Sequence, residues 1–435
     1  MNQDQPVARI QINRRRFLQG SAFAGFAAFL AACSSNNSAS SSPAESPSAP
    51  ASSAPSASAA AASEPAATAA AQTPTGPLNF ANWDAYIDLT TVPGPDGKLG
   101  TDDDEYDLPS PTLDDFTKQY KVEVNYVNAA IDENESFMGK IRPQLEASAD
   151  TGWDLIVLTD WMAKKVVAAN WAEKIDHTVT PTAVANVRDE LKNQPWDPTF
   201  DYHFPWQSFA TGVGYNVKST GRDLTKVADL FDPKFAGKVT LLEDPHDTWP
   251  LIHLMLQAQG KASSDAPEVM TAADGQVVQD YLKPFVESGH IRGFTGNSYL
   301  KDFASGDTWA ALVWSGDLAS SGGENDRFVY PAEGSNIATD NMMIPKGAQH
   351  TYTAELMMDF VYDVTRAARL ANFIYYISPV KGVSEAIKAL DPDLATNPLL
   401  FPPPDVVAKQ HPQPVWDDAT ETTINQQFAD VSGRG

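Results

Sequence analysis

Short apolar runs alternate with amphipathic segments along the chain from about residue 78 onward. Three runs have the alternation and the β-branched or aromatic bias of strands: LNFANW (78–83), KVEVNYV (121–127) and WDLIVL (153–158). Between them, LDDFTKQY (113–120) and FMGKIRPQLEA (137–147) have the periodicity of helices. This strand–helix order predicts an α/β fold with a mostly parallel sheet.

The same pattern restarts in the second half of the chain. Further strands are predicted in GKVTLLED, TWAALVW and NMMIP (237–244, 308–314 and 341–345). TWPLIHLMLQAQG (248–260) predicts a helix, and residues 353–377, which contain no Pro or Gly, predict a long one. Two α/β units that share segments favour a two-lobed molecule over one large sheet.

The first 32 residues have the features of a bacterial export signal. RRRFL at 14–18 resembles the twin-arginine signal, and the apolar run from about residue 22 to 32 is too short to span a bilayer. LAAC at 30–33 resembles the lipobox of bacterial lipoproteins, in which the cysteine becomes the lipidated first residue of the mature chain. We therefore predict a signal peptide over 1–32, a lipid anchor at Cys33, and a periplasmic or cell-surface location.

Two further segments have a biased composition. Residues 33–76 are mostly Ser, Ala and Pro and cannot bury enough apolar surface to fold, so a disordered, lipid-anchored linker is predicted. PGPDGKLGTDDDEYDLPSP (93–111) combines acids with glycines that permit tight turns. Its spacing does not match an EF-hand, so a solvated acidic loop and a calcium site both stay open for Asp96, Asp102, Asp103 and Asp104.

The composition restricts the classes of partner and of chemistry. The chain has 31 Lys and Arg against 56 Asp and Glu, a net charge of −25, which argues against nucleic acid and is compatible with cationic ligands. Its one cysteine cannot form a disulfide within the chain. None of the seven histidines lies in an HExxH motif and no G-x-S-x-G motif is present, so we expect neither enzymatic activity nor a cofactor.

Aromatic and acidic residues recur at the ends of the predicted strands, where open α/β sheets bind ligands. Aromatic rings attract ammonium groups, carboxylates accept charge-assisted hydrogen bonds, and methylenes pack on indole rings. A diamine or polyamine would use all three interactions. The residues at these ends are Trp83, Asp84, Tyr86, Thr159, Trp161, Asp244, Asp247, Trp314 and Asp317, and Asp340 is predicted to begin a further strand.

The body of the chain resembles the spermidine- and putrescine-binding components of bacterial ABC transporters. The matching stretches occur in the family's order over about residues 78–385. This resemblance implies a two-lobed, hinged periplasmic-binding-protein fold of class II type, which closes on its ligand and delivers it to a membrane permease. The stretches are NFANWDAYID, YDLPSPTLDDFTKQYKVEVNY, GWDLIVLTDWM, FPWQSFATGVGYN, FDPKFAGKVTLLEDPHD, FTGNSYLKDFASGD, VWSGD, DNMMIP and SPVKG.

The resemblance also implies roles for individual residues and boundaries for the lobes. Lobe 1 would comprise 78–210 and 338–376, and lobe 2 would comprise 211–337 and 377–435. The acids that hold amino groups in the family match Asp244, Asp247, Asp317 and Asp340. The family's cleft aromatics match Trp83, Tyr86 and Tyr376, its stacking tryptophan matches Trp314, and its second cleft loop matches Thr159 and Trp161.

Two departures from the family pattern leave the choice of ligand open. Many members have Thr or Ser followed by an acid after the first Trp, whereas this chain has Asp84-Ala85. Many have an aromatic residue two positions before the central Asp, where this chain has Ala338. Putrescine, spermidine and other amines therefore all stay open. A receptor for a quaternary amine or a sugar is the alternative that aromatic and acidic residues also permit.

Overall fold

A computed structural model of the chain describes residues 72–84, 86–92, 105–107, 110–131 and 133–433. The predicted signal peptide, Cys33, most of the predicted linker, and Asp96, Asp102, Asp103 and Asp104 lie outside the described residues. Among the described residues, no helix is long and apolar enough to cross a membrane. Within the same ranges, no three His, Cys, Asp or Glu residues are placed to hold a metal ion.

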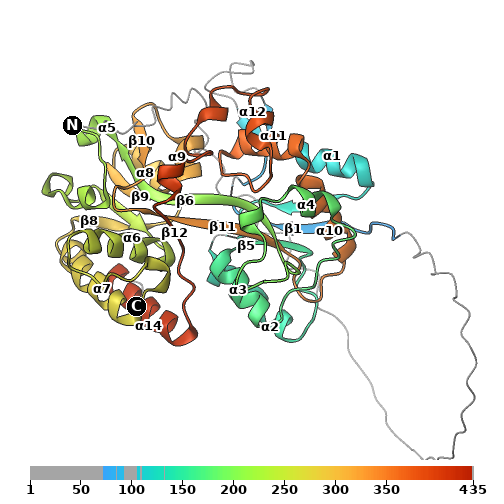
Figure 1. The fold of residues 1–435 in the computed structure, drawn as a ribbon, viewed down its shortest axis with the longest axis horizontal. Coiled ribbons are helices and arrows are strands. Elements are labelled where there is room, and N and C mark those ends of the chain that lie inside the picture. Colours follow the sequence, from blue (N-terminus) through green and yellow to red (C-terminus); the bar gives the residue numbers. More distant parts are fainter. Residues whose placement is uncertain (1–71, 85, 93–104, 108–109, 132, 434–435) are drawn as a thin grey trace, which may run out of the picture. The chain divides into compact units, whose positions relative to one another are not determined.

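Two groups of parallel strands correspond to the two α/β units predicted from the sequence (Figure 1). The first group has the order β4-β1-β5, and the second has the order β9-β7-β8. β5 is buried along its whole length, as its continuous apolar run LIVLT requires. The bounds are β1 (Leu78–Ala81), β4 (Val124–Val127), β5 (Leu155–Thr159), β7 (Val239–Leu242), β8 (Ile291–Thr295) and β9 (Ala310–Trp314).

Two long antiparallel strands, β6 (Phe204–Asn216) and β11 (Ser335–Met343), join the two groups into one sheet. The second half of β11 pairs with β5, and the second half of β6 pairs with β9. The sheet therefore has the order β4-β1-β5-β11-β6-β9-β7-β8, with β10 (Asp326–Val329) on β6 and β12 (Gln410–Pro412) on β11. The lobe boundaries predicted at 210/211 and 337/338 fall inside β6 and β11.

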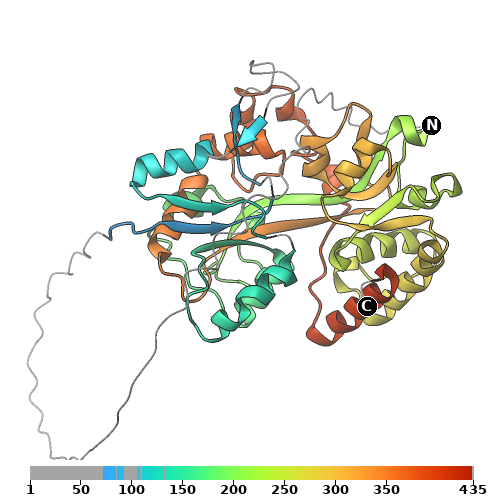
Figure 2. The ribbon, with the colours of Figure 1, turned by 180° about the vertical axis from the view of Figure 1, so that it is seen from behind.

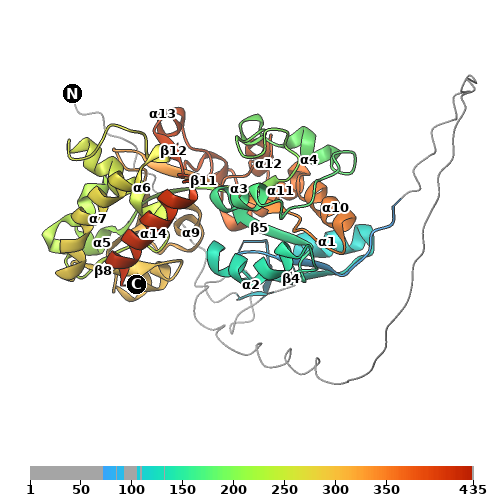
Figure 3. The same ribbon diagram turned by 90° about the horizontal axis from the view of Figure 1, so that it is seen from below.

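Helices lie on both sides of the strands (Figure 2). Viewed from below, α6, α7 and α14 gather at the second strand group, and α2 and α3 gather at the first (Figure 3). A separate strand pair is formed by β2 (Thr90–Val92) and β3 (Glu105–Asp107). The helices are α1 (Pro111–Tyr120), α2 (Asn134–Glu146), α3 (Asp160–Ala168), α4 (Pro181–Asn186), α5 (Val217–Thr220), α6 (Pro245–Ala258), α7 (Ala272–Glu287), α8 (Tyr299–Ser305), α9 (Ser315–Ser321), α10 (Thr351–Val361), α11 (Val364–Ile374), α12 (Val383–Ile387), α13 (Pro404–Val407) and α14 (Asp418–Ser432), with short 3-10 turns at Asp189–Leu191, Val227–Phe231, Pro233–Phe235, Pro267–Val269 and Leu394–Thr396.

The structure corrects two element boundaries. The long helix predicted over 353–377 is divided into α10 and α11, because Asp363 caps the second helix by accepting hydrogen bonds from the backbone of Thr365 and Arg366. Asp340 does not begin a strand. It lies well inside β11, which starts five residues earlier and is already paired with β6 at Asn336.

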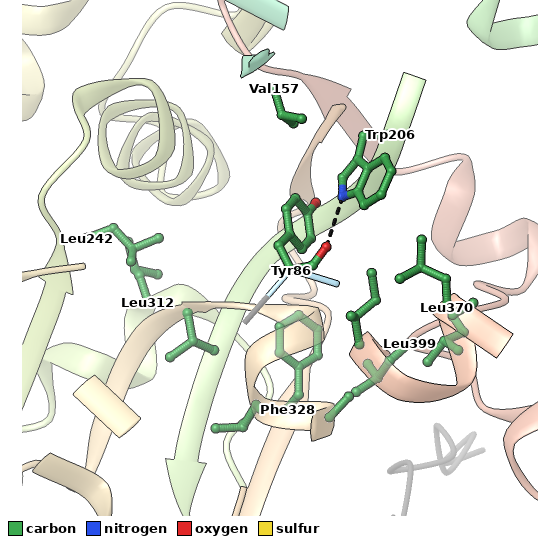
Figure 4. Close-up of a cluster of buried hydrophobic side chains, with 14 of the residues drawn as sticks. Tyr86, Val157, Trp206, Leu242, Leu312, Phe328, Leu370 and Leu399 are labelled. Atoms are coloured by element: carbon green, nitrogen blue, oxygen red, sulfur yellow. Dashed lines mark hydrogen bonds between the residues drawn. The ribbon is translucent and has the colours of Figure 1, made fainter. Parts of the chain in front are cut away.

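The hydrophobic core holds the backbone around the first strand end in place (Figure 4). Trp206 is almost fully buried, and its indole N–H donates to the backbone oxygen of Tyr86 over 3.2 Å. Phe80 and Tyr86 both pack edge-on against the Trp206 ring. These contacts fix the segment that follows β1 and thereby direct the Tyr86 phenol toward the middle of the sheet.

Candidate functional site

A cavity forms where the strand ends of both groups meet β6 and β11. Its wall includes nine of the eleven residues predicted to bind ligand. They come from the ends of β1, β5 and β9, the start of α6, the interior of β11, and the segment after α11. The nine are Trp83, Asp84, Tyr86, Thr159, Asp244, Asp247, Trp314, Asp340 and Tyr376.

Asp340 is buried at the centre of the sheet, and each of its two carboxylate oxygens accepts a hydrogen bond. Its Oδ1 accepts a hydrogen bond from the Thr159 hydroxyl, and its Oδ2 accepts one from the Tyr86 hydroxyl, both at 2.8 Å. Asp160 accepts from the amide of Thr339 and the side chain of Asn341, at a shift in the β6–β11 register. Burial raises the pKa of Asp340 to about 7, and the charge of Asp160 adds to the rise. The hydrogen bonds from Thr159 and Tyr86 oppose this rise.

Asp247 faces the cavity from the first turn of α6. Its Oδ1 accepts from the Thr211 hydroxyl at 2.5 Å and from the Gln413 amide at 2.8 Å, and its Oδ2 accepts from the Trp314 indole at 3.0 Å. Burial raises the pKa of Asp247 to about 7, and the neighbouring charge of Asp244 raises it further. Both central acids therefore hold a proton more readily than an exposed aspartate does.

The local sequence explains why the acids after β7 point into the cavity. Asp244 is the N-cap of α6: its Oδ1 accepts from the backbone N–H of His246 at 2.8 Å. Pro245 at the first helical position sets the helix direction, and Asp247 in the first turn interacts favourably with the positive end of the helix dipole. The sequence EDPHD thus presents Glu243, Asp244 and Asp247 to one cavity.

Five aromatic side chains form a further part of the wall. The Trp83 indole N–H donates to the Val157 carbonyl at 3.0 Å, which fixes the plane of its ring. The rings of Tyr86 and Tyr376 meet edge to face with centroids 4.7 Å apart. Phe209 lies 6.2 Å from both Trp314 and Tyr376. These rings supply the flat apolar surfaces on which methylene groups pack.

Two of the predicted residues do not line the cavity. Asp317 lies behind the wall, where it accepts hydrogen bonds from Asn297, Tyr299 and Tyr376 at 2.5, 2.7 and 2.8 Å. Burial raises its pKa, and those three donors oppose the rise. Trp161 is 2% exposed, and its ring stacks on His246 instead of facing the cavity.

Six further wall residues were not among the predicted site residues. Glu243 adjoins the predicted Asp244, so the acidic pair at the strand end was a signal for it. Glu133 is the N-cap of α2 and Asn134 is its first residue, and burial raises the pKa of Glu133. Gln413 lies beyond the stretch that resembles the family, which left no signal for it. The six are Glu133, Asn134, Phe209, Glu243, Asn297 and Gln413.

The cavity is strongly acidic. Six of its wall residues are carboxylic acids, and none of the described residues that line it is Lys, Arg or His. Within the described part of the chain, the hydrogen-bond donors that reach its two central carboxylates are neutral hydroxyl, amide and indole groups. Such a wall can hold a cation with N–H donors, and it offers no counter-charge for an anion.

The chain is similar to known bacterial proteins in sequence and in fold. The family model of bacterial extracellular solute-binding proteins matches residues 112–402. The spermidine/putrescine-binding periplasmic protein 1 of Haemophilus influenzae is 25% identical over 314 residues, 72% of this chain and 81% of that protein. The putrescine/cadaverine-binding protein of Pseudomonas aeruginosa is 25% identical over 343 residues, 74% of this chain and 90% of that protein. The crystal structure of the TpPotD lipoprotein of Treponema pallidum has a similar fold, with a TM-score of 0.65 at 18% identity, covering 82% of this chain and 99% of that one.

Proposed function

The chain belongs to the family of bacterial extracellular solute-binding proteins, and from this premise we propose that it captures a diamine or polyamine in the acidic, aromatic cavity. As a member of that family it is a binding protein and not an enzyme. The observation that carries the proposal is the wall of six carboxylic acids without a basic side chain among the described residues. Relatives named for binding spermidine, putrescine or cadaverine support the same ligand class.

Each part of a protonated diamine has a matching surface in the cavity. Its ammonium groups can donate to Asp247 and Asp340, whose own burial makes a nearby positive charge favourable. The buried Oε1 of Gln413 has no hydrogen-bond partner within the described residues and can accept a further N–H. Its methylenes can pack on Trp83 and Trp314, at roughly 0.8 kcal/mol per buried CH₂.

Competing small ligands use this wall less well. A quaternary ammonium compound would gain from the aromatic rings, but it has no N–H to donate to the carboxylates. A sugar can stack on indole and donate from its hydroxyl groups, but it brings no positive charge to six acids. The charge of the wall therefore favours a ligand with two or more primary or secondary amines.

Capture is proposed to be the first step of uptake. We infer that the protein is held outside the cytoplasmic membrane by a lipid at Cys33 and passes its ligand to the permease of an ABC transporter. The LAAC motif at 30–33 and the similar fold of a Treponema pallidum lipoprotein support the anchor. The name of the Haemophilus influenzae relative, a periplasmic binding protein, supports a location outside the cytoplasmic membrane.

Calorimetric titration of the full-length chain tests the ligand class. The panel is putrescine, cadaverine and spermidine, with choline and maltose as the competing ligands. We expect at least one of the three amines to bind with a Kd of about 10 μM or tighter, and choline and maltose to bind at least about 100-fold more weakly. Equal or tighter binding of choline or maltose would refute the proposal.

A further inference from the structure

His246 contacts two indole rings beside the cavity. Its imidazole is nearly parallel to the Trp161 ring, at an angle of 6° and a centroid distance of 4.1 Å. The Trp416 ring lies 4.4 Å from the same imidazole, tilted by 34°. All three side chains are buried. The contacts join the start of α3, the start of α6 and the residue just before Asp417, the N-cap of α14.

A cluster of charges continues these contacts. The Lys165 ammonium on α3 lies 2.7 Å from Glu135 on α2 and 2.5 Å from Glu421 on α14. It also lies 4.8 Å from the centre of the Trp161 ring. Glu421 is in turn 4.0 Å from Nε2 of His246. Glu421 is buried, so its pairing with Lys165 is screened far less than a surface ion pair.

The C-terminal segment carries two of these residues across the molecule. It leaves β12, which pairs with β11, and reaches Gln413, which donates to Asp247. The Val415 carbonyl then accepts a long hydrogen bond of 3.4 Å from Lys164 on α3. After Trp416 the chain enters α14, which packs on α7 and α6 (Figures 1 and 3). The segment thus touches helices that belong to both strand groups.

We propose that Trp161, Lys165, His246, Trp416 and Glu421 form a latch that fastens α3 to α6 and α14 and retains the ligand in the cavity. Besides their mutual contacts, the latch residues are linked to the cavity wall through Asp244. Nδ1 of His246 lies 2.9 Å from Oδ1 of Asp244, which lines the cavity. The latch residues are positioning residues: none of the five lines the cavity itself. This inference rests on the proposed function in one respect, namely that the ligand retained in the cavity is an amine.

The latch makes a specific kinetic prediction. The cavity wall comes from elements of both strand groups, so a bound ligand leaves when these elements separate. The latch opposes that separation without touching the ligand. Its loss should therefore raise the dissociation rate and leave the association rate little changed, whereas a folding defect would lower the fraction of protein that binds.

Stopped-flow measurement of putrescine release from the full-length chain tests the latch. Lys165→Ala and Trp416→Ala should each raise the dissociation rate by about tenfold. Trp416→Phe, which keeps an aromatic ring, should have a dissociation rate close to that of the wild type. The matched control is Lys174→Ala. Lys174 also pairs with an acid at 2.7 Å and lies 5.4 Å from an aromatic ring, but its partners, Asp201 and Tyr202, are not latch residues. Dissociation rates for both latch variants within about twofold of the control would overturn the proposal.

Hydrogen exchange without ligand separates this inference from the proposed function. Trp416→Ala should raise the rate of amide exchange in α3, residues 160–168, which lies on the opposite side of the contact. The milder Glu421→Gln should do the same and serves if Trp416→Ala fails to fold. Lys174→Ala should not. Unchanged exchange in α3 for both latch variants would overturn the latch. Failure of the wild-type chain to bind any amine would refute the proposed function and leave the exchange result to decide the latch.

Discussion

At the scale of single residues, the account depends on two buried aspartates. Asp247 and Asp340 are surrounded by neutral donors, and burial raises the pKa of each to about 7. A bound ammonium group supplies the positive charge that this environment lacks, so binding should lower both pKa values. Ligand binding should therefore release protons from these two carboxyl groups, and for this reason the affinity should depend on pH.

Putrescine affinity should therefore rise with pH through the neutral range. Below about pH 7 the free protein holds protons on Asp247 and Asp340 that the ligand must displace, whereas the amines stay protonated up to about pH 10. Titration at about pH 6, 7 and 8 should show affinity increasing by at least about tenfold. Calorimetry in buffers of different ionisation enthalpy should show proton release at the lowest pH. A flat profile, or proton uptake, would contradict the assignment of these acids.

Asp340→Asn should weaken putrescine binding by about 100-fold, because it removes a buried charge that the ligand is proposed to neutralise. The variant keeps the size of the side chain, so its melting temperature should stay close to that of the wild type. Asp201→Asn, at a partly exposed acid paired with Lys174, is the matched control and should bind normally. Normal binding by Asp340→Asn would show that the ligand does not meet this residue.

The sequence could locate most of the cavity's residues, because strand ends in an α/β fold converge on one edge. It predicted Asp317 to bind the ligand, whereas the structure places this residue behind the wall, where it accepts hydrogen bonds from side chains of separate segments that only the tertiary structure brings together. The sequence could not identify Gln413, which reaches the cavity from a C-terminal segment with little resemblance to the family. Trp161 was expected beside the ligand, but its ring is occupied by His246.

At the scale of elements, the apolar pattern predicted short strands even where they are fully buried, as in β5 and β7, but it did not predict the long buried strand β6. β6 is buried along nearly its entire length and shows no alternation, so the sequence indicated neither its type nor its 13-residue extent. The sequence pattern predicted one helix over 353–377. Asp363, the residue at which the structure divides this region, can occur inside a helix as well as at its N-cap, so it gave no clear signal of the division.

Asp363→Ala should lower the free energy of unfolding by about 1 kcal/mol, the usual cost of losing an N-cap. The side chain accepts from the backbone of Thr365 at 3.1 Å and of Arg366 at 3.2 Å, and alanine would leave both N–H groups without this acceptor. Denaturant unfolding checks this value. Asp280→Ala, at an exposed position within α7, should be neutral or slightly stabilising. An equal effect at both positions would argue against a capping role.

At the scale of the whole molecule, we propose an amine-binding body that is joined to a membrane anchor. The body's fold was expected from the α/β pattern and the family resemblance, and the family match and the structure confirm it. The anchor stays a prediction from the LAAC motif, since Cys33 lies outside the described residues. The exact lobe boundaries stay predictions too, and two of them fall inside the continuous strands β6 and β11, which lie between the two strand groups.

Cys33→Ser should release the protein from the membrane. A serine cannot carry the thioether-linked lipid of a bacterial lipoprotein, and the tail of the chain has no other group for this attachment. Fractionation of cells that express the full-length chain should find the wild type with the membranes and the variant in the soluble extracytoplasmic fraction. Ser34→Ala is the control. Membrane retention of Cys33→Ser would exclude lipidation at this residue as the anchor.

The most direct test of the central claim is a crystal structure of the full-length chain grown with putrescine. We expect the ligand in the cavity, with its amine nitrogens within about 3 Å of the carboxylates of Asp340 and Asp247 and its methylenes against Trp83 or Trp314. Putrescine bound at another site, with these two carboxylates making no contact to it, would contradict the account.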